Sequence, residues 1–142
     1  MKFSTKSRYA LRVMIELAER NDAYVPLKEL AKSQNISLKY LESIMSLLTK
    51  HQLVQGLQGK GGGYKLTKDA EKYKISDMLC VTEVSLAPVT CLECKAPVCD
   101  RNTTCKTLPM WERFAKMVRD YFDNISIKDL AYSNLNKLNW LK

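Results

Sequence analysis

Every glycine of this 142-residue chain lies between residues 56 and 63. Short alternating runs flank the cluster, at residues 53–55 before it and 64–66 after it. Glycine supplies the backbone conformations that tight turns need, so the pattern predicts a β-hairpin with a glycine-rich tip. A nucleotide-binding loop is disfavoured, because the glycine spacing is wrong and the flanks predict strand–loop–strand. A plain turn without a binding role remains the alternative.

Three helical patterns precede the hairpin. The first is expected over residues 4–20, the second opens at Pro26, and the third runs from an N-cap at Ser37 to about His51. The third has apolar residues at i, i+3, i+4 and i+7 and a polar opposite face. Two short helices joined by a tight turn and followed by a hairpin indicate a winged helix-turn-helix. The apolar positions of the third helix are Leu41, Ile44, Met45 and Leu48.

A long helix is expected from Thr107 and Pro109 onwards, where apolar residues recur at alternating spacings of three and four. That seam is typical of a helix that pairs with a second copy. Ser126 and Asp129 predict a capping box for a last short helix. The expected dimer seam is Leu108, Trp111, Ala115, Val118, Phe122 and Ile125.

The positive charge is concentrated in the first half of the chain. The formal net charge is +8, and residues 1–75 hold 14 Lys and Arg against 7 Asp and Glu, whereas residues 76–142 hold 9 against 8. A basic half beside a near-neutral half indicates a surface for a polyanion, which the helix pattern makes duplex DNA rather than a membrane. With no signal peptide or membrane-length apolar run, we expect a cytoplasmic protein with reduced cysteines.

Four of the five cysteines fall on one segment that is expected to be irregular. Cys91, Cys94, Cys99 and Cys105 have the spacing C-x2-C-x4-C-x5-C, so they could converge on one metal centre. An iron–sulfur cluster is favoured; zinc, a cluster-free thiol switch and incidental thiols are the alternatives. Cys80 is expected to be a buried small apolar residue.

An enzyme is not expected from this sequence. The chain has a single histidine, and its carboxylates are scattered over polar helix faces. No arrangement of nucleophile, base and orienting group can be built from these residues.

These patterns together predict a mainly α protein with a small β-hairpin wing. We expect a winged helix-turn-helix DNA-binding domain over residues 1–75. A connecting helix and a cysteine-rich sensor loop would follow over residues 76–106. A dimerisation helix and a C-terminal helix would complete the chain over residues 107–142.

Several motifs resemble the Rrf-two family of bacterial regulators. They are residues 1–10 (MKFSTKSRYA), 36–42 (ISLKYLE) and 59–64 (GKGGGY), together with Cys99-x5-Cys105 followed by LPMW at 108–111. The resemblance spans nearly the whole chain and implies a homodimeric winged-helix transcription factor. Members of this family include an iron–sulfur cluster regulator, a nitric-oxide sensor and a cysteine-metabolism repressor.

The resemblance also implies a ligand set. Cluster-binding members use three cysteines between the DNA-binding domain and the long helix, and Cys91, Cys99 and Cys105 match them, with Cys94 as the possible fourth ligand. The cluster would be of the 2Fe-2S or 4Fe-4S type. The chain departs from the family at Leu108, where cluster regulators carry a histidine, and at Arg8, where nitric-oxide sensors carry an acidic residue. It also has Gln58 where an arginine often precedes the first wing glycine.

The expected partner is duplex DNA, with a pseudo-palindromic operator that matches the two-fold axis of a homodimer. The third helix would read bases in the major groove, and Glu42 could accept a hydrogen bond from a cytosine amino group. Lys6, Arg8 and Lys50 would meet phosphates, and the wing would approach the minor groove. The candidate DNA-binding residues are Lys6, Arg8, Ser37, Lys39, Tyr40, Glu42, Ser43, Lys50, Gln58 and Lys60.

The predicted function is a transcriptional regulator that senses redox, iron–sulfur or nitrosative status through its cluster. The alternative is a cluster-free DNA-binding repressor, controlled by thiol redox or by a partner, with incidental or zinc-binding cysteines.

Overall fold

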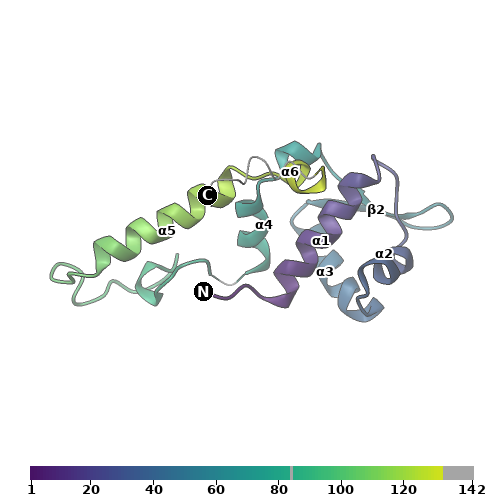
Figure 1. Cartoon of the computed structure of the whole chain (residues 1–142). Helices are drawn as coiled ribbons and strands as arrows, with labels where there is room; N and C mark the ends of the chain where they lie inside the picture. Colours follow the sequence, from purple (N-terminus) through teal and green to yellow (C-terminus); the bar gives the residue numbers. More distant parts are fainter. Residues whose placement is uncertain (84, 133–142) are drawn as a thin grey trace.

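The computed structural model describes residues 1–83 and 85–132. They form a mainly helical molecule with one antiparallel hairpin, which confirms the expected fold class (Figure 1). The last stretch of the expected C-terminal segment, residues 133–142, lies outside the described part. The elements are α1 (Thr5–Glu19), α2 (Leu27–Gln34), α3 (Leu38–Lys50), β1 (Val54–Leu57), β2 (Gly63–Leu66), the 3-10 helix η1 (Ala70–Lys72), α4 (Ile75–Thr82), the 3-10 helix η2 (Thr90–Leu92), α5 (Leu108–Asp123) and α6 (Ile127–Ala131).

The helix-turn-helix is set by local capping. The Ser37 hydroxyl accepts a hydrogen bond from the Tyr40 N–H at 3.3 Å, which confirms the predicted N-cap of α3. Helix α2 ends at Asn35, whose φ of +53° places it in the left-handed region that stops helices. The turn between α2 and α3 is therefore tight.

The predicted apolar face of α3 is the centre of the core. Leu41, Ile44, Met45 and Leu48 are each fully buried. They belong to one apolar cluster that takes in residues of α1, the hairpin and α4, and extends to Ile127 of α6. The core thus runs continuously from the helix-turn-helix to the end of the described chain.

The hairpin is anchored to the residue that precedes α2. Strands β1 and β2 pair from Val54 opposite Leu66 to Leu57 opposite Gly63. Tyr64 and Val25 exchange two backbone hydrogen bonds of 2.9 Å. A Cβ on Gly63 would lie 2.2 Å from the Val25 carbonyl oxygen, and the φ of Gly63 is +145°, so this position requires glycine. The wing is therefore held against the helix-turn-helix at its base.

Side-chain hydrogen bonds of Arg12 and Glu16 join α1 to the end of α2. Arg12 donates to the Gln34 side-chain oxygen at 2.9 Å and to the Gln34 carbonyl at 2.6 Å. The carboxylate of Glu16, only 7% exposed, accepts hydrogen bonds from Ser33, Gln34 and Arg20. Burial raises the pKa of Glu16, but these hydrogen bonds outweigh burial, and the net pKa is lowered.

Tyr73 connects the wing to the end of α5. Its hydroxyl donates to the Leu53 carbonyl at 2.8 Å and accepts from the N–H groups of Thr67 at 2.9 Å and Lys68 at 3.1 Å. Its own carbonyl accepts the Ile127 N–H at 3.0 Å. The Ile75 N–H donates to the Ile125 carbonyl at 3.0 Å, so residues 73–75 pair with residues 125–127. We call these paired segments the joint.

Helix α5 differs from the expected seam at its last position. It ends at Asp123, and Ile125, at 6% exposure, belongs to the protomer's own core. The prediction that Ile125 continues the helical seam is wrong, because the chain turns at Asn124 and begins the Ser126 capping box, which is confirmed. No residue of α5 is fully buried, and its most exposed apolar side chains are Met110, Phe114 and Met117.

The expectation for Cys80 is also wrong, since its side chain is exposed on α4. Helix α4 buries Met78 and Leu79 instead, and Cys80 follows them onto the outer side of the helix. A small apolar neighbourhood in the sequence did not decide which side of a short helix faces the core.

Replacing Tyr73 with Phe is expected to lower the free energy of unfolding by about 1–3 kcal/mol, because two N–H groups and a carbonyl lose a buried partner. Urea unfolding followed by circular dichroism measures the change. The matched control is Tyr24→Phe, whose hydroxyl has one long exposed hydrogen bond to Gln55. Equal, small losses in both variants would show that Tyr73 does not hold the joint to the wing.

Replacing Glu16 with Gln is expected to lower the free energy of unfolding near neutral pH by about 1–3 kcal/mol. A carboxylate with a lowered folded pKa stabilises the fold above its unfolded pKa of about 4.3 and loses that contribution as pH falls through the folded value. The difference between the variant and the native chain should therefore shrink towards about pH 3. Urea unfolding at both pH values tests this, with exposed Glu19→Gln as the control. A deficit that stays constant with pH would contradict the role of the charge.

Candidate DNA interface and cysteine pocket

A groove runs between the outer face of α3 and the wing. Its volume is about 760 Å³, and Pro26 and Leu27 at the start of α2 also line it. Helix α3 contributes polar and charged residues, and the hairpin contributes four glycines with Leu57, Gln58 and Tyr64. The α3 residues lining it are Glu42, Ser46, Thr49 and Lys50.

The groove brings together three of the residues predicted to contact DNA, namely Glu42, Lys50 and Gln58. Ser46 and Thr49 line it as well and were not in the predicted set. Their spacing from Glu42, at i+4 and i+7, is the signal that identifies them, because residues so spaced share one helix face. The Thr49 hydroxyl is already bonded to the Met45 carbonyl at 2.8 Å.

Two predicted residues on the first turn of α3 have structural partners. The Tyr40 ring is half-buried and makes an edge contact with Tyr9 of α1, with ring centroids 5.9 Å apart. The Ser43 hydroxyl donates to the Tyr40 carbonyl at 2.7 Å. Lys39 beside them is exposed. The Tyr9–Tyr40 pair thus fixes the start of α3 against α1.

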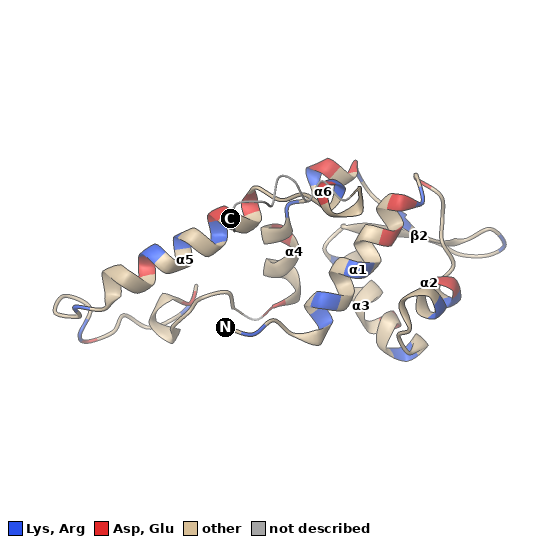
Figure 2. Cartoon of the chain, in the orientation of Figure 1, with Lys and Arg blue, Asp and Glu red and all other residues tan. Residues whose placement is uncertain are grey.

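Basic side chains lie outside the groove on both flanks. Figure 2 shows Lys and Arg on the first turns of α1 and at the tip of the hairpin. Lys6 and Arg8 are exposed on α1, and Lys60 is exposed at the hairpin tip between Gly59 and Gly61. These three residues do not line the groove, so they flank it rather than form it.

The loop cysteines are divided by the fold. Cys91, Cys99 and Cys105 line one pocket of about 240 Å³, which we call the cysteine pocket, together with Leu108 and Glu112 of α5. Cys94 is exposed and does not line this pocket. Backbone turns at residues 90–96 and 99–104 place the side chains in this way.

The donor chemistry of the pocket fits a thiolate-bound metal group. Three thiols and one carboxylate share a single hollow, and soft thiolates are the ligands of iron–sulfur clusters. Within residues 1–83 and 85–132, however, no three Cys, His, Asp or Glu side chains already stand close enough to hold a metal ion. The pocket gathers the donors on one surface without closing them into a site.

Cys105 has a thiol that ionises more readily than usual. Its sulfur lies 3.4 Å from the Thr107 hydroxyl, and hydrogen bonds from the Thr107 side chain and backbone lower the pKa of Cys105. Cys105 lies three residues before the start of α5 at Leu108 and two before its N-cap, Thr107. The pKa of this thiol is therefore lowered at the end of the loop where α5 begins.

No helix among the described residues combines the length and the apolar character that crossing a bilayer requires.

Comparison with known proteins assigns the chain to a family. The profile of the Rrf2 (Rrf-two) family, described as "Iron-dependent Transcriptional regulator", matches residues 3–133. The HTH-type transcriptional regulator IscR of Vibrio campbellii is 33% identical over 135 residues, which cover 94% of this chain and 79% of that protein.

Two solved structures share the fold over most of their length. The structure of CymR, the global cysteine regulator of B. subtilis, has a TM-score of 0.75 and 34% identity, covering 94% of this chain and 98% of that one. T. potens IscR has a TM-score of 0.75 and 29% identity, covering 94% and 88%. From the profile match over nearly the whole chain and the IscR and CymR relatives, the protein belongs to the Rrf2 family of DNA-binding transcriptional regulators, which are not enzymes.

Proposed function

We propose that this chain is a cytoplasmic, homodimeric regulator whose binding to duplex DNA is set by an iron–sulfur cluster in the cysteine pocket. One observation carries the proposal: Cys91, Cys99 and Cys105, three cysteines of one irregular segment, line one pocket beside the start of α5. The signal would be redox, iron–sulfur or nitrosative status, each of which acts on such a cluster.

The unpartnered face of α5 supports the homodimer. Its half-buried residues lie beside three strongly exposed ones, Met110 at 55%, Phe114 at 40% and Met117 at 64%. An apolar helix face of this length is covered by a partner in stable proteins. A second copy of α5, paired along the heptad seam, is the cover we propose. The seam residues in this arrangement are Leu108, Trp111, Ala115, Val118 and Phe122.

The DNA contacts follow from the groove and its flanks. We propose that Lys39 and Glu42 meet base edges from the start of α3, where Ser37, Tyr40 and Ser43 hold the helix in place. The basic flanks would bind phosphates, and the wing would enter the minor groove. The phosphate contacts are Lys6, Arg8 and Lys50, and the wing contacts are Gln58 and Lys60.

The cluster would be held by the thiolates of Cys91, Cys99 and Cys105. When bound, it supplies a centre whose charge and integrity change with oxidants or nitric oxide. The protein's part is to fold residues 88–106 around the donors and to hold them against the first turn of α5.

The joint offers a route from the pocket to the DNA-binding surface. The loop of residues 88–106, which carries the cysteine pocket, and the wing lie at opposite ends of the molecule, and α5 runs from that loop to the joint (Figure 1). At the joint, the Ser76 hydroxyl is hydrogen-bonded to the Asp123 carboxylate, and Tyr73 connects onward to the wing. A change in the position of α5 would therefore alter the hydrogen bonds that hold the base of the wing.

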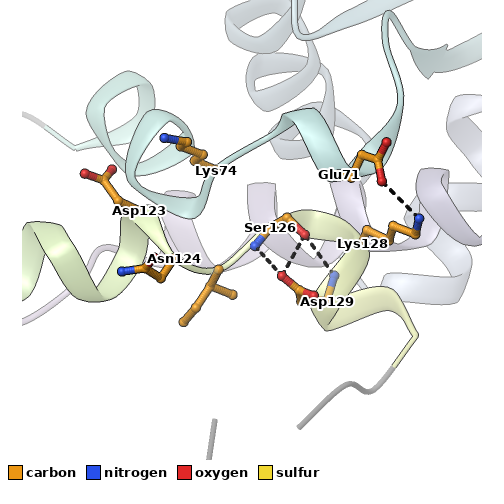
Figure 3. Close-up of a pocket in the computed structure, with 8 residues that line it drawn as sticks. Glu71, Lys74, Asp123, Asn124, Ser126, Lys128 and Asp129 are labelled. Atoms are coloured by element: carbon orange, nitrogen blue, oxygen red, sulfur yellow. Dashed lines mark hydrogen bonds and ion pairs between the residues drawn. The ribbon is translucent and has the colours of Figure 1, made fainter. Parts of the chain in front are cut away.

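The surroundings of the joint leave it room to shift. Figure 3 shows an open polar pocket of about 450 Å³ beside it, in which Ser126 is bonded to Asp129 and Glu71 to Lys128. The Glu71–Lys128 ion pair is solvent-exposed, and such pairs are weak. Breaking this ion pair would cost little free energy.

A cluster-free regulator is the second candidate. It is favoured by the lowered pKa of Cys105 and by the absence, within the described ranges, of a preassembled metal site. The likeness to a cysteine regulator agrees with it. In that case the thiols, or a zinc ion bound by them, would control the protein, or a partner would do so with the cysteines incidental.

Binding to a random-sequence duplex should weaken steeply with salt, with a log–log slope of about −0.9 for each phosphate neutralised. Lys60→Ala and Lys6→Ala should each reduce the magnitude of the slope by about 1. Lys116→Ala, which removes a charge from exposed α5, is the matched control and should leave the slope unchanged. Fluorescence anisotropy over a salt series measures it. A slope near zero in the native protein would contradict the DNA-binding surface.

The Cys99→Ala variant should lose the cluster. Protein purified or reconstituted without oxygen should be brown, with iron and sulfide in stoichiometric amounts, and its DNA affinity should change when air bleaches it. Cys99→Ala should be colourless, with one DNA affinity under both conditions, while Cys80→Ala behaves like the native chain, because Cys80 lies outside the pocket. A colourless native protein whose affinity for DNA is the same before and after exposure to air would overturn the proposal. Metal analysis would then separate zinc from incidental thiols.

A further inference from the structure

We propose that Glu112 is the fourth protein ligand of the group held by Cys91, Cys99 and Cys105. The inference rests on the cluster proposed above and adds the residue that completes its coordination. It replaces Cys94, the fourth ligand that the spacing of the cysteines suggests.

The position of Glu112 is fixed by α5. Glu112 and the three cysteines line the same pocket, and so does Leu108, one helical turn earlier on the same face of α5. Leu108 carries no ligand atom, so Glu112 is the residue of this face that can donate one. Cys105 is in the loop, but α5 starts only three residues after it, and the Leu108 N–H donates to the Cys105 carbonyl at 3.4 Å, so a short turn joins that thiol to the helix that carries Glu112.

The carboxylate of Glu112 is not engaged elsewhere in the described chain. On a helix, the residue four positions later is the usual partner of a glutamate. Here that residue, Lys116, is bonded to Asp120 instead. No hydrogen bond or ion pair of Glu112 occurs among residues 1–83 and 85–132. A carboxylate at a thiol-lined pocket, without a partner of its own, is available to a metal.

The competing donors of the loop are placed differently. Cys94 and Glu93 both lie outside the pocket lining, whereas Cys91, Cys99, Cys105 and Glu112 line it. The hydrogen bond from the Ala96 N–H to the Glu93 carbonyl, 3.0 Å long, closes a turn through these residues. Cys94 lies within that turn.

A carboxylate ligand has a chemical signature. Its oxygen is a harder donor than thiolate sulfur, so one iron would differ from the others in its ligand field. Exchanging that oxygen for another donor should change the spectrum and the retention of the cluster. Replacing Glu112 with Cys should give an all-thiolate cluster with a shifted spectrum and intact iron content.

The experiment compares the native chain with Glu112→Gln, Glu112→Cys, Cys94→Ser and the matched control Glu93→Gln. Each is reconstituted anaerobically with iron and sulfide, and its metal content, visible circular dichroism and electron paramagnetic resonance after reduction are recorded. Far-ultraviolet circular dichroism checks that each variant is folded, which the exposure of Glu112 favours. Loss of iron to a chelator measures how firmly the cluster is retained.

Glu112→Gln should alter the spectrum and lose iron about tenfold faster than the native chain. Cys94→Ser and Glu93→Gln should match the native chain. A loaded native protein with unchanged Glu112→Gln and altered Cys94→Ser would overturn this inference alone. A native protein that takes up no iron would overturn the proposed cluster as well, so the two failures are distinguishable.

Discussion

The buried hydroxyl of Tyr73 ties the parts of this molecule together. It donates to the Leu53 carbonyl just before β1 and accepts from the Thr67 N–H just after β2. The backbone carbonyl of the same residue accepts the Ile127 N–H. The hydroxyl has hydrogen-bond partners in Leu53, Thr67 and Lys68, and Tyr73 is only 1% exposed, so this is a costly point to disturb. Tyr73 therefore connects the wing and the core to the segment that follows α5, and we propose that the position of α5 is coupled to the DNA-binding surface through it.

In the proposed function, Tyr73 would connect the basic DNA-binding surface to the cysteines, although the two lie far apart. The basic residues flank a groove built on α3 and the wing, whereas the cysteine pocket closes on the opposite end of α5. Leu108 and Glu112 of α5 line the cysteine pocket, so a rearrangement of the loop would change the contacts of α5 directly. Because α5 is a rigid helix, a displacement at the loop would be transmitted along it to the joint. The exposed apolar side of α5 is where we propose that the α5 of a second protomer packs.

Sequence patterns predicted the elements that local chemistry decides. The Ser37 cap, the buried face of α3 and the Ser126 box were confirmed because each depends on residues within one or two turns of chain. The predictions for Ile125 and Cys80 were wrong because tertiary packing sets the burial of these side chains. Ile125 follows the end of α5 and lies in the core, whereas Cys80 lies on the outer side of α4. The hydrogen bonds of Glu16 to the end of α2, and the position of Cys94 outside the cysteine pocket, depend on how the chain turns between elements. The spacing of residues in the sequence does not encode that geometry.

The central claim is that the cysteine pocket and the wing are coupled through α5 and the joint. Backbone hydrogen exchange, measured on the cluster-loaded protein and on the same protein after the cluster is removed, tests it most directly. The account predicts that protection changes in residues 88–106 and also at 73–75, at 125–127 and in the hairpin. A change confined to residues 88–106, with the joint and the wing unaltered, would contradict it.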